Sequence, residues 1–205
     1  MIINLGSETV SAFVVETVSG GTLAAYPPPE GYWPNIRKTC DRHNVLLILK
    51  YRYLGSSGLL MSLITLGTMT LGAPDWGCDE RVAHSIFKKY IEAGGNTLDI
   101  ADIYAGGRSE AIVGNLIPEL NRDGLIIASK CPLPSGPAVT QFGANRKQII
   151  SACEISLKRL KTDYIEIYHI HVPDPIPSLE ETLRSMDDLV RQGMVRYTGS
   201  SMFFG

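Results

Sequence analysis

Residues 96–130 read NTLDIADIYAGGRSEAIVGNLIPELNRDGLIIASK and contain two apolar runs separated by a helical pattern. The first run ends at Asp99, and the second covers Leu125–Ser129. Between them, Ser109 opens a segment whose apolar residues recur at helical spacing: Ile112, Val113 and Leu116. A strand, a helix and a second strand in this order predict a βαβ unit, whose two strands run parallel.

The same alternation continues on both sides of this unit. Further apolar runs predict strands at Ser62–Gly67, Tyr164–His171 and Val195–Ser200. Three residues of the N-cap type open the remaining helical patterns: Asp79, Asn145 and Ser178. Five strands alternating with four helices predict an α/β fold with a parallel sheet, either open or closed into a barrel. A closed barrel of eight βα units takes about 250 residues, so residues 51–205 can supply only a partial barrel of about five units.

Two of the predicted helices carry apolar stripes that we expect to be buried. After Asp79 the stripe comprises Val82, Ile86, Tyr90 and Ile91. After Ser178 it comprises Leu179, Leu183, Met186 and Val190. Ser178 and Glu181 also have the spacing of a capping box, in which each side chain accepts a hydrogen bond from a free backbone N–H of the other residue.

Residues 1–49 differ in character from the rest of the chain. Strand-like runs at Ser11–Thr17 and Val45–Leu49 flank a Gly/Pro-rich stretch at Gly20–Gly31 and a possible helix at Pro34–Arg42. We therefore expect two parts: an N-terminal α/β appendage over residues 1–49 and the partial barrel over residues 50–205.

Composition excludes several classes of protein. A hydrophobic content of 44% with 20% charged residues indicates a globular chain. The net charge of −2 offers no basis for binding nucleic acid or an anionic membrane surface. No run approaches the roughly 18–20 apolar residues of a membrane span, and the start lacks the pattern of a signal peptide. Four scattered cysteines without metal-site spacing (Cys40, Cys78, Cys131 and Cys153) favour a reducing, cytoplasmic location.

Reactive side chains follow three neighbouring predicted strands. Asp99, Lys130 and His171 each close a strand, and Tyr104 lies five residues after Asp99. Reduction of a carbonyl group needs a hydride and a proton donor for the oxygen. A tyrosine hydroxyl is a weak acid, with a reference pKa of about 10, and a nearby ammonium lowers that pKa. A carboxylate can hold the lysine in place, and an imidazole can orient the carbonyl group.

Each of these residues also has an ordinary structural explanation. Tyr104 could be a packing residue at the rim, Lys130 a solvated strand end, and Asp99 a turn cap beside Asp102. The coincidence of all four at equivalent strand ends favours a site. In the loop between them, Arg108 and Glu110 could form a local ion pair or touch a substrate, and the structural pair is the favoured interpretation.

A metal site is a weaker alternative. His169 and His171 form an HxH pair, and alternate residues of a strand share a face. Two histidines on a barrel face could bind zinc in a hydrolase, but a catalytic zinc site needs a third protein ligand. His43 and His84 lie in poor contexts for that role, so we expect no metal.

Residues 50–205 resemble the aldo-keto reductase family along their whole length. The matching stretches are KYRYLGSSGL, LGTMTLG, AGGNTLDIADIYAGGRSE, IIASK, TDYIEIYHIHVPDP, SLEETLRSMDDLV and QGMVRYTGSS. The resemblance implies a TIM barrel that reduces aldehydes or ketones with NADP(H), NAD(H) being possible. It also implies that Tyr104 is the general acid, that Lys130 and Asp99 tune it, and that His171 orients the carbonyl group.

The same resemblance implies cofactor contacts at four positions: Gly67, Thr68, Met69 and Ser201. The family's fifth strand usually ends in Ser-Asn, whereas Ser201 is followed here by Met202, which lacks the amide. The last three barrel strands of the family, with most of its cofactor contacts, are not in this sequence. We therefore expect weak or absent activity from this truncated chain.

Residues 1–49 resemble a different family, the class III aminotransferases that depend on pyridoxal phosphate (PLP). The resemblance rests on SAFVVETVSGGTLAAYPPPEGYWPNIRKTCDRHNVLLIL. In that family an Asp that follows the strand pairs with the cofactor's pyridine nitrogen, but Lys50 stands in that region here. Because a cation facing a pyridinium has the wrong sign, we expect no PLP.

Two hypotheses therefore stand beside the zinc hydrolase. In the first, the chain is a carbonyl reductase acting on a small molecule, and a second polypeptide could complete its barrel. In the second, it is a non-catalytic fusion product, joined at Leu49–Lys50, that self-associates or binds a partner through an open barrel edge.

Overall fold

The structure is a computed structural model that describes residues 12–13, 35, 38, 42, 46–47, 51–131 and 143–203. The chain divides into two compact units. The first comprises Met1–Thr65 and Lys88–Asn96, and the second comprises Leu66–Phe87 and Thr97–Gly205.

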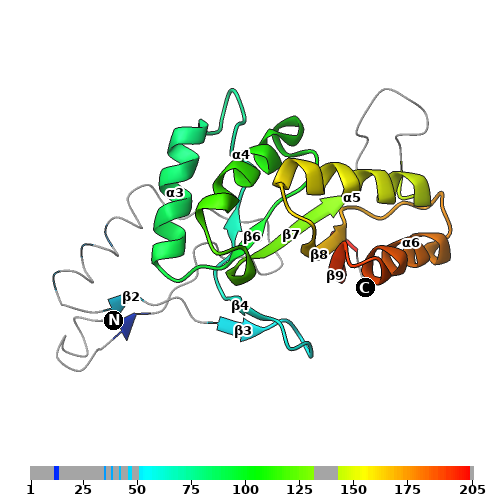
Figure 1. Ribbon diagram of the computed structural model, residues 1–205, viewed down its shortest axis with the longest axis horizontal. Coiled ribbons are helices and arrows are strands. Elements are labelled where there is room, and N and C mark those ends of the chain that lie inside the picture. Colours follow the sequence, from blue (N-terminus) through cyan, green and yellow to red (C-terminus); the bar gives the residue numbers. More distant parts are fainter. Residues whose placement is uncertain are drawn as a thin grey trace. The chain divides into compact units, whose positions relative to one another are not determined.

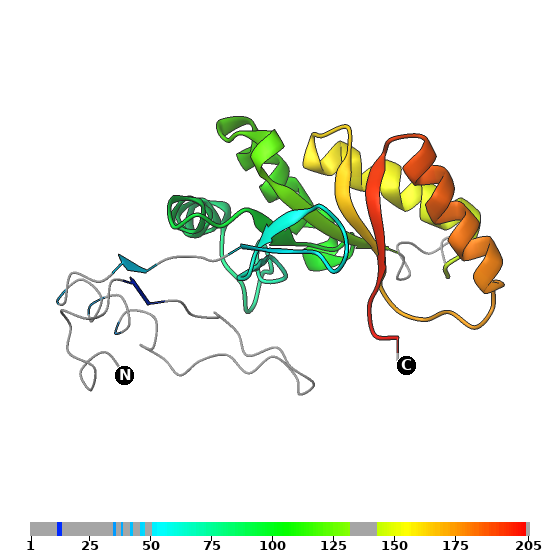
Figure 2. The ribbon, with the colours of Figure 1, turned by 90° about the horizontal axis from the view of Figure 1, so that it is seen from below.

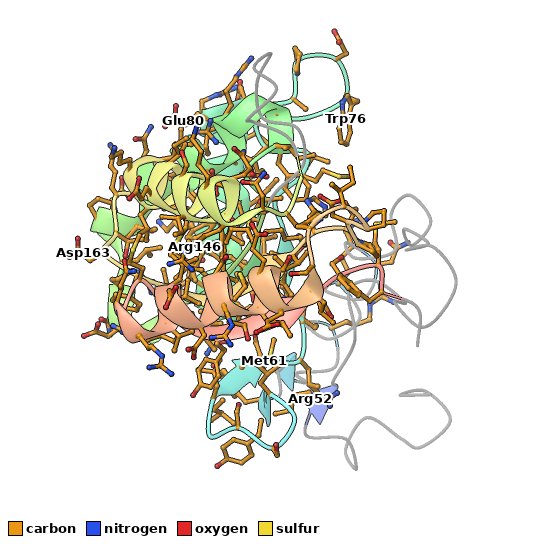
Figure 3. The ribbon with its side chains drawn as sticks, turned by 90° about the vertical axis from the view of Figure 1, so that its right-hand side faces the viewer. Arg52, Met61, Trp76, Glu80, Arg146 and Asp163 are labelled. Carbon is orange, nitrogen blue, oxygen red and sulfur yellow. The ribbon has the colours of Figure 1, made fainter. Side chains whose placement is uncertain are left out.

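Among the described residues, the first unit contains two small sheets. Strand β1 (Ala12–Phe13) pairs in parallel with β2 (Leu46–Leu47). Strand β3 (Tyr51–Tyr53) pairs antiparallel with β4 (Leu60–Ser62), so that Arg52 lies opposite Met61 (Figure 3). The β3–β4 hairpin was not predicted from the sequence.

Little of the predicted N-terminal appendage lies within the described residues. Ala12–Phe13 and Leu46–Leu47 are strands, as expected from the runs that contain them. Asn35, Lys38 and Arg42 are helical, as expected for the segment that begins at Pro34. The Gly/Pro-rich stretch and the predicted junction at Leu49–Lys50 lie outside the described residues.

The second unit is built on a parallel five-stranded sheet in the order β5-β6-β7-β8-β9 (Figure 1). Its strands are β5 (Leu66–Gly67), β6 (Thr97–Asp99), β7 (Ile126–Cys131), β8 (Ile165–Ile170) and β9 (Val195–Ser200). The helices are α3 (Glu80–Glu92), whose last residues belong to the first unit, α4 (Arg108–Leu116), α5 (Arg146–Leu160) and α6 (Leu179–Arg191). Short 3₁₀ turns lie at η2 (Tyr104–Gly107), η3 (Ile117–Glu119) and η4 (Arg122–Gly124). The predicted alternation of five strands and four helices is confirmed.

Helices α4, α5 and α6 lie side by side along the outside of this sheet (Figures 1 and 2). Strand β7 is buried over its whole length, because strands cover both its edges and the helices cover one face. This burial explains why its sequence is continuously apolar up to Ser129 rather than alternating. The core between the sheet and the helices is formed by side chains such as Leu98, Ile127, Ile149, Leu160, Ile165 and Leu189.

The predicted N-caps are present. Asp79 Oδ1 accepts a hydrogen bond from Val82 N, Asn145 Oδ1 from Gln148 N, and Ser178 Oγ from Glu181 N. The capping box at Ser178 is only half formed. Glu181 Oε1 instead accepts a hydrogen bond from Arg146 N at the start of α5, so its carboxylate joins two helices.

The predicted buried stripes of two helices were partly wrong. On α3 the buried residues are Ala83 and Phe87, while Val82 and Ile86 are exposed. On α6, Met186 is buried as expected, but Leu179 and Leu183 are exposed. On α3 the buried pair follows the exposed pair by one position, and on α6 the buried Thr182 and Met186 share a four-residue spacing that is offset by one position from that of Leu179 and Leu183. Periodicity alone therefore does not identify the buried face.

The predicted strand Ser62–Gly67 is also wrong in part. The chain leaves β4 at Ser62, where Ser62 N donates to Asn96 Oδ1 and Ser62 Oγ donates to Ile64 O. These bonds turn the backbone, and only Leu66–Gly67 belong to the parallel sheet. Within the described residues, no helix is long and apolar enough to cross a membrane.

Candidate active site

Four side chains predicted to act together gather at the carboxyl ends of β6, β7 and β8. Asp99 is the last residue of β6, and Lys130 is the penultimate residue of β7. His171 follows β8 directly, and its N–H donates to Cys131 O, which extends the pairing of the two strands. Tyr104 was expected near a strand end and lies in the turn η2, between β6 and α4.

The Lys130 ammonium links its own strand, β7, to the end of β6 and to the turn η2. Lys130 Nζ lies 2.7 Å from Asp99 Oδ1, donates to Ile100 O at 2.9 Å, and donates to Tyr104 OH at 3.0 Å. Its side chain is 9% exposed, so burial strengthens these charge-assisted bonds. An ammonium is only a donor, and Tyr104 oxygen is therefore the acceptor. The phenolic hydrogen of Tyr104 stays available for another partner.

His171 lies beside Tyr104 with a free ring nitrogen. The two rings are edge to face, with centroids 6.1 Å apart and planes at 81°. His171 Nδ1 is buried and has no hydrogen-bond partner among the described residues. Burial, and secondarily the Lys130 charge, lower the pKa of His171, so the imidazole is neutral near pH 7.

The residues predicted to contact a cofactor lie at the two edges of the sheet. Gly67 ends β5, where a side chain would meet open space, and Met69 is exposed just beyond it. Thr68 between them is buried, and both its N–H and its Oγ1 donate to Asp99 O. Ser201 directly follows β9, and its N–H donates to Ile170 O.

A family model described as the aldo/keto reductase family matches residues 63–204. The chain belongs to this family. The resemblance inferred from the sequence motifs is therefore confirmed for residues 63–204. Members of the family use a nicotinamide cofactor and act on small carbonyl compounds.

Named aldo-keto reductases are similar over the same region. The chain is 37% identical to aldo-keto reductase AFTS1 of Alternaria alternata over 74% of its length, and 38% identical to aldo-keto reductase YhdN of Bacillus subtilis over 76%. It is also 37% identical to a putative aryl-alcohol dehydrogenase of Schizosaccharomyces pombe over 74%. These alignments cover 49%, 47% and 51% of the respective relatives. The chain thus spans about half the length of the curated relatives it matches.

A solved aldo-keto reductase has the same fold over this part. The crystal structure of the thermostable aldo-keto reductase Tm1743 with the inhibitor epalrestat superposes with a TM-score of 0.67 at 35% identity. The match covers 76% of this chain and 54% of that one. With the five parallel strands and their helices, this similarity confirms the predicted partial TIM barrel. The aminotransferase resemblance of residues 1–49 stays a prediction.

The structure also shows an ion pair of this aldo/keto reductase family member that the sequence did not indicate, between half-buried Arg159 and buried Glu110. Arg159 Nη1 of α5 donates to Glu110 Oε2 of α4 at 3.1 Å and to Asp102 O at 2.9 Å. The predicted local pair between Arg108 and Glu110 is therefore wrong. Glu110 is fully buried and its partner lies on another helix. Spacing within one segment cannot reveal a partner so far along the chain.

Ser109 was noted only as a helix start, but it supports the end of β6. Its Oγ lies 2.8 Å from Thr68 O and 2.9 Å from Thr68 Oγ1, and Thr68 in turn bonds to Asp99 O. This buried chain of hydrogen bonds fixes the backbone that carries Asp99.

The HxH pair gains no support as a metal site in this reductase fold. His169 lies opposite Lys130 in the sheet, and its Nδ1 is 3.3 Å from Ser129 O. No group of three or more His, Cys, Asp or Glu residues among those that the structure describes could hold a metal ion. A third ligand for a zinc hydrolase is therefore not found in the described ranges.

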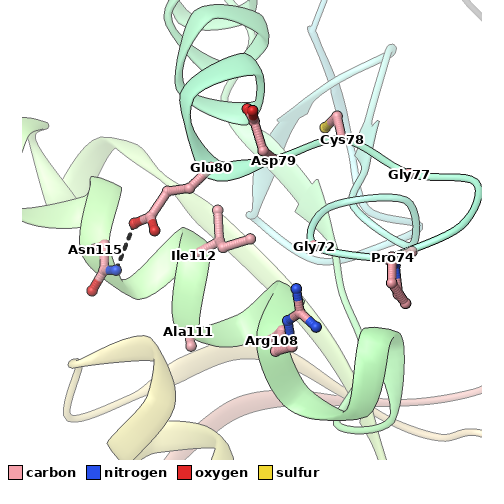
Figure 4. A pocket seen from close by; sticks show the side chains of 11 residues that line it. Gly72, Pro74, Gly77, Cys78, Asp79, Glu80, Arg108, Ala111, Ile112 and Asn115 are labelled. Atoms are coloured by element: carbon pink, nitrogen blue, oxygen red, sulfur yellow. Dashed lines mark hydrogen bonds between the residues drawn. The ribbon is translucent and has the colours of Figure 1, made fainter.

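A separate pocket of about 450 Å³ lies between the β5–α3 loop and α4 (Figure 4). Asn115 Nδ2 donates to Glu80 Oε1 across it, and the guanidinium of Arg108 lines it. None of the predicted catalytic or cofactor-contacting residues lines this pocket. Its charged groups of both signs are exposed, so it is not the candidate active site.

Proposed function

We propose that this chain carries the proton-donating site of an enzyme that reduces an aldehyde or ketone to an alcohol. The hydride donor is NADP(H), with NAD(H) as the alternative. Family membership supports the oxidoreductase class. The observation that carries the site assignment is the contact of Lys130 Nζ with both Asp99 and Tyr104. Because the chain spans about half of its relatives, activity, substrate and cofactor are all part of the proposal.

In this proposal Tyr104 donates its phenolic proton to the carbonyl oxygen. When hydride adds to the carbonyl carbon, negative charge develops on the oxygen, and Tyr104 O–H neutralises it. The resulting phenolate remains hydrogen-bonded to the Lys130 ammonium 3.0 Å away, which stabilises it. Water then returns a proton to Tyr104. Asp99 holds Lys130 so that the ammonium stays in reach of the phenolic oxygen.

His171 orients the substrate in this scheme. Its ring stands edge to face with that of Tyr104, so a carbonyl oxygen can lie between the phenol and the imidazole. A neutral imidazole can donate one N–H to that oxygen without competing for the Tyr104 proton. The lowered pKa of His171 supports this neutral form.

The residues at the sheet edges fit a nicotinamide group. The open space at Gly67 and the exposed Met69 leave room at the end of β5, and Ser201 offers a hydroxyl at the end of β9. Gly67, Thr68, Met69 and Ser201 would hold the cofactor, which supplies the hydride when bound. Pyridoxal phosphate is not part of the proposal, because Lys50 has the wrong charge for its pyridine nitrogen. Free Cys78, Cys131 and Cys153 support a cytoplasmic location.

The substitution Tyr104→Phe tests the proton donor. We expect it to lower kcat for an aromatic aldehyde at least about 100-fold, while the affinity for NADPH, measured by fluorescence titration, stays the same. Tyr197→Phe, on β9 and away from Lys130, is the matched control and should keep full turnover. Unchanged turnover in Tyr104→Phe would rule out the assigned acid. Undetectable NADPH binding by the folded wild-type chain would rule out the reductase function for this chain alone.

A second candidate is a non-catalytic role in which the chain associates with itself. Among the described strands, β9 pairs only with β8, so its other edge offers unpaired backbone groups. Exposed Leu179 and Leu183 lie on the neighbouring helix α6. The mass of the protein in solution distinguishes this candidate from a monomeric reductase.

A further inference from the structure

The turn that carries Tyr104 has an unusual backbone. Ala105, Gly106 and Gly107 have φ values of 51°, 65° and 89°, so three consecutive residues are in the left-handed region. This conformation is sterically unfavourable for Ala105, which has a Cβ, but not for the two glycines. Within the turn, Tyr104 N donates to Ala101 O and Gly106 N donates to Ile103 O. Such a strained turn persists only where surrounding groups hold it.

One side chain from α5 contacts the turn on both sides of Tyr104. Arg159 Nη1 donates to Asp102 O, two residues before Tyr104, at 2.9 Å. The same guanidinium pairs with Glu110, six residues after Tyr104, at 3.1 Å. Glu110 is fully buried, and its other oxygen accepts from Ser129 Oγ of β7 at 3.0 Å. Arg159 thus links the start of the turn to a fixed point between α4 and the sheet.

The guanidinium also lies against the turn at Gly107. A Cβ at Gly107 would overlap the Cζ and both terminal nitrogens of Arg159. The absence of a side chain at this position therefore lets Arg159 approach the backbone. Three contacts at Asp102, Gly107 and Glu110 fix the turn, while the Tyr104 ring itself contacts Lys130 and His171 instead.

We propose that Arg159 is a positioning residue that holds the Tyr104 hydroxyl at hydrogen-bonding distance from Lys130. The effect of Arg159 on catalysis rests on the proposed function. Its effect on geometry does not, because replacing Arg159 should change the surroundings of the Tyr104 ring whether or not the chain turns over a substrate.

Arg122 provides a matched control. It pairs with the buried carboxylate of Glu166 at 2.7 Å and donates to the backbone oxygens of Leu125 and Tyr164. These contacts resemble those of Arg159 but lie at the amino-terminal ends of β7 and β8, away from Tyr104. Arg→Lys at either position keeps the charge opposite the carboxylate and removes the planar guanidinium. At Arg159 this removes the Nη1 that makes both hydrogen bonds and the group that lies against Gly107, and at Arg122 it removes the nitrogens that share several acceptors.

The experiment compares Arg159→Lys with Arg122→Lys in protein labelled with 3-fluorotyrosine. The ¹⁹F signal of Tyr104, assigned from Tyr104→Phe, should shift or broaden in Arg159→Lys and stay unchanged in Arg122→Lys. With an aldehyde and NADPH, Arg159→Lys should lower kcat roughly 10- to 100-fold with little change in the KM for NADPH, and Arg122→Lys should keep kcat.

Arg159→Met combined with Glu110→Gln is the second variant, because it leaves no buried charge unpaired. It should perturb the Tyr104 signal more than Arg159→Lys does. An unchanged Tyr104 signal in both folded Arg159 variants would overturn the positioning role. If the wild-type chain shows no turnover, the proposed function fails, and the ¹⁹F signal alone then decides the role of Arg159.

Discussion

Asp102 lies in the same turn as Tyr104 but belongs to a different environment. Its carboxyl group is buried, and neither oxygen has a well-formed hydrogen bond among the described residues. Burial and the neighbouring Glu110 raise the pKa of Asp102 to about 7, against weaker favourable effects of the Ile103 N–H and Arg159. The other titratable groups that it influences are Cys131 of β7 and Tyr168 of β8.

This environment predicts a pH-dependent stability. Because the pKa of Asp102 is higher in the folded chain than the value of about 3.9 in unfolded chains, the folded state binds the extra proton. The contribution of Asp102 to stability is therefore full below about pH 4 and is lost as the pH rises to about 7. In Asp102→Asn this loss should be absent. On going from pH 4.5 to pH 8, the free energy of unfolding of the variant should therefore rise by on the order of 2–4 kcal/mol relative to that of wild type.

Urea unfolding of the two proteins at both pH values measures this difference. Asp123→Asn is a suitable control, since it makes the same substitution at an exposed position. Equal pH dependence of wild type and Asp102→Asn would show that Asp102 is already ionised at low pH in the folded chain.

At this scale the sequence predicted the residues with reactive groups but not those that support them. Asp99, Lys130 and His171 could be found because each follows an apolar strand, and strand ends meet at one edge of a parallel sheet. Arg159, Glu110 and Asp102 could not be found in this way. Their contacts join the turn after β6 and helix α4 to a residue of α5, and no local spacing encodes them.

At the scale of single elements, helix starts were more predictable than helix faces. An N-cap depends on one side chain and a backbone N–H three residues later, as at Asn145 and Ser178. A buried face depends on what the neighbouring elements cover. Leu179 and Leu183 are therefore exposed although their spacing is that of a buried stripe.

The N-cap of α6 gives an element-scale prediction. Ser178→Ala removes the acceptor for Glu181 N and should destabilise the protein by about 1 kcal/mol. Ser178→Asp keeps an acceptor and favours the positive end of the helix dipole, so its stability should match wild type. Thermal unfolding followed by circular dichroism provides the measurement. A loss of the same size in both variants would mean that the cap hydrogen bond is not the stabilising contact.

At the scale of the whole molecule, the order of the sheet was predictable because parallel βα units add strands in sequence. The β3–β4 hairpin was not predictable in this way. The stretch that contains its turn, Leu54–Leu59, served only as part of the family resemblance and was not examined for a hairpin. The arrangement of residues 1–49 depends on segments outside the described residues, and its proposed origin in an aminotransferase stays a prediction.

The free edge of β9 gives the prediction at this scale. If association proceeds through that edge, the wild-type mass from light scattering should exceed that of a monomer and rise with concentration. Thr198→Lys places a charge on an exposed position of β9 and should shift the protein toward monomer, because charged edges resist strand pairing. The control is Thr182→Ser, because Thr182 is buried on α6 and its substitution leaves the edge of β9 unchanged. A monomeric wild type at all concentrations would exclude the second candidate function.

The three hydrogen bonds of Lys130 have a chemical consequence beyond acid strength. Aldehydes condense readily with free amines to form imines, and such adducts inactivate lysine side chains. A nitrogen that carries three hydrogens, each directed at Asp99, Ile100 O or Tyr104, has no lone pair with which to attack a carbonyl carbon. The arrangement that keeps Lys130 in position would thus also protect the site from covalent damage by an aldehyde of the kind proposed as substrate.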